Sequence, residues 1–225
     1  MNKFLAVVSG KGGVGKTVTA INLAFCLKDH HDILLVDGNL HNPHIGLHLG
    51  VHNKEQTLHT AMLGHHHVSK AVYDVQGMKV VTGSLNKNIS FAALEKQLAA
   101  LYGYGEKIIV DCPPGNAEHI LKHCQQGILV ATPDRVSVAE AYRTLQTTAS
   151  LGVEVLGVVL NRVNSHHYEL AQKHIEQFLQ LPVLGVIPED NGIPKSIMRQ
   201  VPVVDMNPHC KASQAFISLS KYVIP

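Results

Sequence analysis

The chain has 225 residues and a formal net charge of +2, with 45% hydrophobic and 16% charged residues. This is the composition of a soluble globular protein, and a chain of this length buries about 70% of its unfolded surface without a disulfide or metal staple. No stretch approaches the roughly 20 consecutive apolar residues of a membrane span. The scattered lysines and four arginines argue against a strong nucleic-acid-binding surface. The N-terminal apolar run is too short for a signal peptide, so we expect one cytoplasmic domain, 1–225.

Short runs rich in β-branched residues predict strands at 4–8, 33–36, 79–82, 107–110, 127–131, 155–160 and 183–187. Segments of helical periodicity alternate with them, at 16–29, 92–102, 117–124, 136–150, 168–180 and 210–223. Strands such as 33–36 have no polar face, which is typical of a parallel sheet covered by helices on both sides. The alternation predicts an α/β fold with a doubly wound, mostly parallel sheet.

Apolar stripes on two of the predicted helices indicate how they pack. The stripe of the helix at 168–180 consists of Tyr168, Ala171, Ile175 and Phe178. We expect it to pack on the sheet. The stripe of the last helix consists of Ala212, Ala215, Phe216, Leu219 and Val223, and it fits core packing. The segment 41–78 is weakly patterned and rich in His and Gly, and we expect it to be the most mobile region.

Cysteine and histidine spacing gives little support for a metal centre. The cysteines form no C-x-C or C-x-x-C pair, which disfavours a zinc ribbon or an iron–sulfur cluster. The run 65–67 offers three imidazoles but no second ligand cluster, so a solvated loop is favoured over a metal site there. The 16 histidines add positive charge as the pH falls toward 6.

A phosphate-binding pattern, G-x-x-x-x-G-K-[ST], lies between the first predicted strand and helix. It reads Gly10, Lys11, Gly12, Gly13, Val14, Gly15, Lys16 and Thr17, and Val18 follows it. Glycines let backbone N–H groups curl around phosphates, and the next helix directs its positive end at them. Lys16 supplies charge to the β and γ phosphates, and the Thr17 hydroxyl ligates magnesium. The pattern predicts binding of ATP with Mg²⁺.

With its second lysine, Lys11, this loop resembles that of the deviant-Walker ATPases of the MinD/ParA family. The resemblance implies a three-layer P-loop NTPase fold and a homodimer closed by ATP, in which Lys11 reaches the partner's nucleotide. The segment 34–40 looks like the family's first switch, and 108–115 resembles its Walker B strand and second switch. These matches imply that Asp37 and Asp111 join Thr17 at the metal.

Two later segments resemble the base-binding side of the family's site. In 157–162 the resemblance implies that Asn161, followed by Arg162, reads the edge of adenine, because a carboxamide offers both a donor and an acceptor. The segment 185–190 is similar to the second base-side loop, whose binding positions are Pro188, Glu189 and Asp190. These stretches are closer to MinD-like than to ParA-like proteins.

The sequence departs from the family pattern at two places. MinD-like proteins carry D-x-D in the first switch, and here the second position is Asn39. Asparagine cannot take a proton, but its amide can position water, so the predicted catalytic set of Lys11, Lys16 and Asn39 implies slow hydrolysis. The chain also stops before the basic amphipathic helix of membrane-binding members, so direct membrane binding is weakly supported.

The favoured function is an ATP-dependent homodimeric switch for cellular positioning, at a division site, a membrane or a cell pole. It would answer to a protein activator or positioned partner, and it would be cytoplasmic, or peripheral at a membrane through that partner. A metal or iron–sulfur carrier would need interface cysteine pairs, and a ParA-like DNA-segregation factor would need a basic surface. A hydrolysis-deficient ATP-binding scaffold is also compatible with Asn39.

Overall fold

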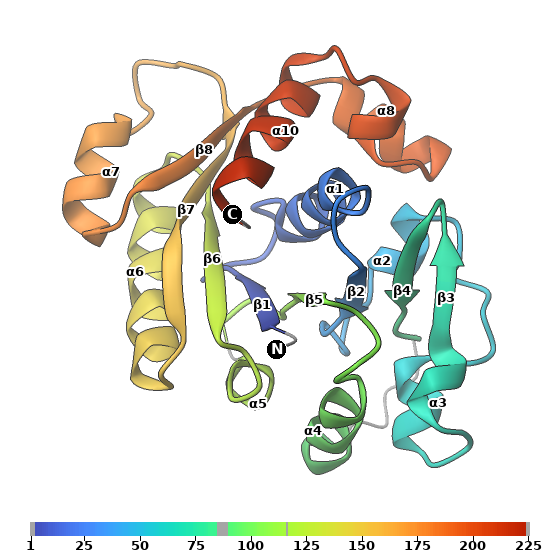
Figure 1. Ribbon diagram of the computed structural model, residues 1–225. Coiled ribbons are helices and arrows are strands. Elements are labelled where there is room, and N and C mark those ends of the chain that lie inside the picture. The colour runs from blue at the N-terminus through green and yellow to red at the C-terminus, as the bar shows by residue number, and fades with distance from the viewer. Residues whose placement is uncertain (1–2, 85–89, 116, 224–225) are drawn as a thin grey trace.

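The computed structural model describes residues 3–84, 90–115 and 117–223, and an eight-stranded sheet forms its centre (Figure 1). The strands are β1 Lys3–Val8, β2 Ile33–Asp37, β3 Val72–Val75, β4 Met78–Val81, β5 Lys107–Asp111, β6 Gln126–Ala131, β7 Glu154–Val163 and β8 Val183–Pro188. Their order is β3-β4-β2-β5-β1-β6-β7-β8. Only the β3–β4 pair among these is antiparallel. The predicted doubly wound, mostly parallel α/β fold is confirmed.

Helices cover both faces of the sheet. They are α1 Lys16–Leu27, α2 Ile45–His48, α3 Leu58–Met62, α4 Phe91–Ala100, α5 Glu118–Leu121, α6 Arg135–Ser150, α7 Gln172–Leu179, α8 Gly192–Arg199, α9 Val203–Met206 and α10 Lys211–Val223, with a 3₁₀ turn, η1, at Val68–Ala71. Figure 1 shows α1 and α10 together on one side of the strands and α4 and α5 on the other. Along β1, Phe4 and Ala6 enter one apolar core and Leu5 and Val7 enter the other. This alternation explains why the strands have no polar face.

The register of the central strands brings their carboxyl ends to one edge. Asp37, the last residue of β2, lies opposite Asp111, the last residue of β5. Val7 of β1 also lies opposite Asp111, so the loop after β1 begins next to both carboxylates. Ligands of open α/β sheets bind at this edge.

The prediction for the helix at 168–180 is wrong in its start and its packing. The helix begins at Gln172, and Tyr168 lies before it with 70% of its surface exposed. Of the four predicted stripe residues only Ile175 is buried, and Phe178 instead contacts Tyr142 of α6, with ring centroids 5.2 Å apart. The buried residues of α7 are Ile175 and Leu179, one turn apart, so the helix packs through a narrow stripe on one side.

The weakly patterned segment 41–78 folds into α2, α3, η1 and β3, none of which periodicity predicted. A capping box at the start of α3 explains part of this order, because the Thr57 hydroxyl accepts from the Thr60 amide and the Thr60 hydroxyl accepts from the Thr57 amide. The expected stripe of α10 is confirmed, with Phe216 and Leu219 fully buried. Within the described residues, each helix is too short or too polar to cross a membrane.

Candidate functional site

The glycine-rich loop connects β1 to α1 and leaves room for a ligand. At Gly12 and Gly13 an added Cβ would meet no described atom within 4 Å. Gly15 has φ of 92°, and an added Cβ there would lie 2.0 Å from the Asn161 Nδ2 atom. It precedes α1 without a side-chain cap, so the first amides of that helix face the loop. This is the geometry of an anion site at a helix N-terminus.

Lys16 and Thr17 meet Asp111 at the floor of the loop. The Lys16 Nζ atom lies 3.9 Å from Asp111 Oδ1, and the Thr17 hydroxyl donates to Asp111 Oδ2 at 2.5 Å. Asp111 is fully buried, and its Oδ1 atom accepts no hydrogen bond from the described residues. Burial raises the pKa of Asp111, while the neighbouring Lys16 and the Thr17 hydrogen bond act in the opposite direction. A buried carboxylate oxygen without a donor is a ready acceptor for the water shell of a cation.

Asp37 is held beside Asp111 by backbone amides. Its Oδ1 accepts from the Asn39 amide at 3.3 Å and its Oδ2 from the Ile45 amide at 3.0 Å. Burial and the negative Asp111 raise the pKa of Asp37 well above its usual value. A buried carboxylate whose pKa is raised by a neighbouring carboxylate marks a place where a divalent cation is electrostatically favoured. Asn39, 6% exposed, lies in the adjoining wall.

On the base side, the Asn161 Nδ2 atom donates to the Val14 carbonyl at 2.7 Å, while Oδ1 has no donor among the described residues. A small pocket of about 130 Å³ borders it, lined by Gly15, Val18, Asn161, Arg162, Glu189, Ile193, Pro194 and Ile197. Asp190 serves the scaffold instead, because its carboxylate accepts from the Gly192 and Ala212 amides. Neither Asp190 nor Pro188 lines the pocket.

Lys11 and Gly10 lie at the outer side of the loop. The Lys11 Nζ atom pairs with Asp134 Oδ2 at 3.5 Å, and the Lys11 side chain does not line the phosphate pocket. Asp134 caps α6 by accepting from the Ser137 amide at 2.9 Å. Gly10 packs so closely on Glu140 of α6 that an added Cβ would lie 2.3 Å from the Glu140 carbonyl.

The phosphate pocket itself has a volume of about 320 Å³. Its lining residues are Gly12, Gly13, Gly15, Lys16, Thr17, Val18, Asn39, Asn42, His44, His48, Pro114, Arg162 and Ile197. Periodicity and family pattern single out most of the loop but miss His44 and His48. The 41–78 histidines have no sequence signal that separates a pocket residue from a surface one.

Another residue missed from the sequence is His59, which anchors the first switch. It is fully buried, its Nε2 lies 3.1 Å from the Leu40 carbonyl, and its Nδ1 accepts from the Ser84 amide at 3.0 Å. Nδ1 as acceptor fixes Nε2 as the donor, so His59 is neutral, in agreement with a pKa lowered by burial. No cluster of three or more His, Cys, Asp or Glu that could bind a metal is found among the described residues, the run at 65–67 included.

Comparison with known proteins identifies a family and similar solved structures. The family model for the CobQ/CobB/MinD/ParA nucleotide binding domain matches residues 5–203. An uncharacterised ATP-binding protein of Methanocaldococcus jannaschii is 31% identical, over 98% of this chain and 87% of its own. The septum site-determining protein MinD of Pyrococcus horikoshii, solved with Mg-ADP, superposes with a TM-score of 0.94 at 29% identity, covering 100% of this chain and 96% of that one. The cell division ATPase MinD of Pyrococcus furiosus gives the same TM-score and identity, over 99% and 98%.

Proposed function

The chain belongs to the CobQ/CobB/MinD/ParA nucleotide-binding family, and from this premise we propose that it is a MinD-like, ATP-dependent homodimeric switch for cellular positioning that hydrolyses ATP slowly. The expected cofactors, ATP and Mg²⁺, are those of the family. The observation that carries the proposal is a pair of buried oxygens to which no described residue donates, Asp111 Oδ1 beneath the loop and Asn161 Oδ1 beside it. We treat 1–225 as one domain.

The phosphate end of the pocket suits a triphosphate with its metal. Gly12 and Gly13 leave open space, and Lys16 and the start of α1 supply positive charge. Thr17, Asp37 and Asp111 would hold Mg²⁺, which would supply positive charge against the phosphates when bound. Because the Thr17 hydroxyl donates its proton to Asp111, its oxygen lone pairs stay available to a metal ion.

The base end favours adenine over guanine. With Nδ2 occupied by the Val14 carbonyl, Asn161 presents only its Oδ1 acceptor. Adenine carries a donor at N6, whereas guanine has an acceptor at O6, so guanine would face oxygen with oxygen. Arg162 and Glu189, whose closest charged atoms are 3.9 Å apart, border the same pocket and would flank the nucleoside.

The dimer would require Lys11 to leave Asp134. The Lys11 side chain is 38% exposed, so its ion pair is screened by water and contributes little stability. Breaking this ion pair therefore costs little free energy, and Lys11 could then reach the nucleotide of a second copy. Light scattering with and without ATP tests this step: we expect ATP to double the mass, and Lys11→Ala and Lys16→Ala to remain monomeric. An ATP-independent mass would contradict it.

Slow hydrolysis follows from Asn39, which lines the phosphate pocket where an acidic residue stands in the family pattern. Its amide can orient water but cannot accept a proton. We expect Asn39→Asp to release phosphate about tenfold faster than the native protein. Equal rates would refute the assigned role of Asn39, and no turnover in either protein would favour an ATP-binding scaffold.

Carrier and DNA-segregation roles find less support. A metal or iron–sulfur carrier would need paired surface thiols, but Cys112 and Cys124 are buried and Cys26 and Cys210 are half-buried. A DNA-segregation role would require a basic surface, which scattered cations do not provide. The switch would instead answer to a protein activator or positioned partner, which would also bring it to a membrane.

A further inference from the structure

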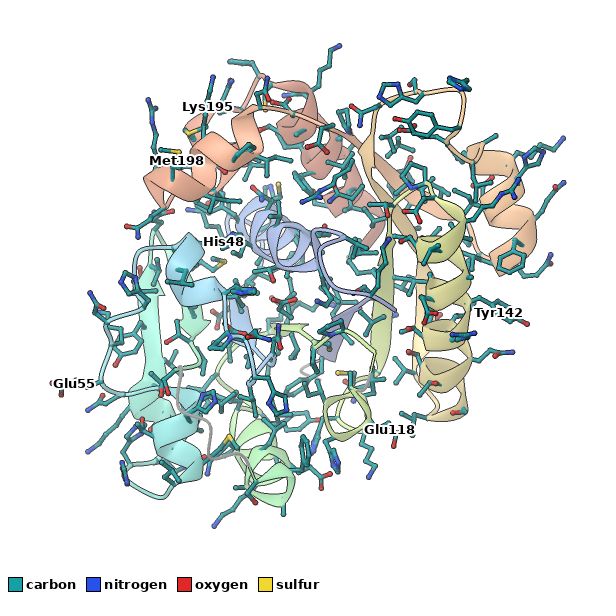
Figure 2. The ribbon with its side chains drawn as sticks, turned by 180° about the vertical axis from the view of Figure 1, so that it is seen from behind. His48, Glu55, Glu118, Tyr142, Lys195 and Met198 are labelled. Carbon is teal, nitrogen blue, oxygen red and sulfur yellow. The ribbon has the colours of Figure 1, made fainter. Side chains whose placement is uncertain are left out.

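Two histidines that follow the first switch in the chain line the phosphate pocket opposite the glycine-rich loop. His44 precedes α2 and His48 ends it, so they lie one helical turn apart on the same side of the helix. Both line the pocket that Lys16 and Thr17 line. Figure 2 shows His48 at α2, beside α1. The recognised phosphate-binding pattern includes neither residue.

The surroundings of these histidines are positively charged. The pocket wall also contains Lys16 and Arg162, and none of its described lining residues is acidic. The carboxylates of Asp37 and Asp111 lie below the pocket lining, on the side where His44 lies. Lys16 and Arg162 each lie 3.9 Å from a carboxylate, of Asp111 and of Glu189, but no carboxylate is among the residues that line this pocket. A lining with cations and no acidic side chain favours a polyanionic ligand.

The two histidines differ in position along that ligand. His44 lies at the metal end, because it precedes Ile45, whose amide donates to Asp37, and its charge acts on Asp111. His48 lies toward the base end, because α2 packs on α8 and Ile197 of α8 lines both the phosphate and the base pocket.

We propose that His44 and His48 bind the nucleotide phosphates, His44 at the γ end and His48 at the α and β end, as a second wall facing Lys16. This inference rests on the proposed ATP site. Without a ligand, burial and the neighbouring His44 lower the pKa of His48 to about 4. A phosphate beside His48 would relieve that penalty, since a nearby negative charge favours the imidazolium.

Calorimetric titration with Mg-ADP and with the Mg complex of β,γ-imido-ATP tests the proposal. His44→Ala should weaken binding of the triphosphate about tenfold and of Mg-ADP less than threefold, because a hydrogen bond to a charged group is lost only at the γ end. His48→Ala should weaken binding of both nucleotides about tenfold. The matched control is His52→Ala, four residues beyond the end of α2 and outside the pocket lining, which should bind like the native protein.

If both pocket variants bind each nucleotide as His52→Ala does, the inference is overturned while native binding keeps the proposed ATP site. If the native protein binds neither nucleotide, the ATP site itself fails. Should an alanine variant unfold, His48→Gln and His44→Gln keep comparable volume and replace it. A second readout is the ¹⁵N-histidine NMR spectrum: the signals lost in each variant should shift when the Mg complex of β,γ-imido-ATP is added to native protein, and unshifted signals would contradict phosphate contact.

Discussion

Gly15 carries two constraints at the scale of a single residue. Its φ of 92° is unfavourable for any side chain, and a Cβ would lie 2.0 Å from Asn161 Nδ2. We expect Gly15→Ala to lower the free energy of unfolding by about 3 kcal/mol, from backbone strain and displacement of Asn161. Urea unfolding without nucleotide measures it. Gly12→Ala, which meets no described atom within 4 Å and has no positive φ, is the control and should lose less than about 1 kcal/mol.

The residues of the site differ in how far the sequence could predict them. The fixed phosphate-loop pattern after β1 contains Lys16 and Thr17, and Asp111 is the last residue of β5. Their contact could therefore be expected from the order of these segments in the chain. His44 and His48 could not, because only the packing of α2 against α8 turns them toward the loop. The orientation of Asn161 was also hidden, since it depends on a hydrogen bond to Val14, 147 residues away in the chain.

At the scale of elements, the start of α6 couples helix capping to Lys11. Asp134 accepts from the Ser137 amide and also pairs with Lys11, so its roles can be separated. We expect Asp134→Ala to cost about 1 kcal/mol of stability through the lost cap, and Asp134→Ser to cost little because serine also caps. Both variants free Lys11, so both should dimerise with ATP at least as readily as native protein. Thermal unfolding and light scattering check the two effects, and weaker dimerisation of the serine variant would exclude Asp134 as a restraint.

Elements that are buried on both faces could be predicted from the sequence, whereas elements that are only partly buried could not. The parallel strands were recognisable because successive residues enter the two cores on opposite faces of the sheet, Leu34 one core and Leu35 the other. Helix α7 was misjudged because Tyr168 and Phe178 are apolar yet exposed, so apolar spacing did not report burial. Strand β3 was missed because it is a four-residue antiparallel edge whose pattern is half-buried, which short-range periodicity cannot distinguish from a loop.

At the scale of the whole molecule, the pH dependence of folding combines buried groups of opposite sign. Burial lowers the pKa values of His48 and His59, so their neutral forms stabilise the fold fully above pH 6.5, and stability is lost as the pH falls below that value. Burial raises the pKa values of Asp37 and Asp111, so protonation of these carboxyls offsets part of that loss. The pH profile of the native protein alone therefore cannot identify any one group.

A difference between two proteins isolates His48. With its pKa lowered from 6.5 to about 4 on folding, His48 should cost the native fold about 2 kcal/mol between pH 7.5 and pH 5. In His48→Ala this loss is absent, while the contributions of Asp37, Asp111 and His59 remain. Urea unfolding at both pH values, without nucleotide, should therefore show the variant gaining about 2 kcal/mol on native protein as the pH falls. The control, His52→Ala, should follow the native protein at both pH values. If the curve of His48→Ala also ran parallel to the native curve, His48 would already carry its proton in the ligand-free pocket, where Lys16, Arg162 and His44 oppose it.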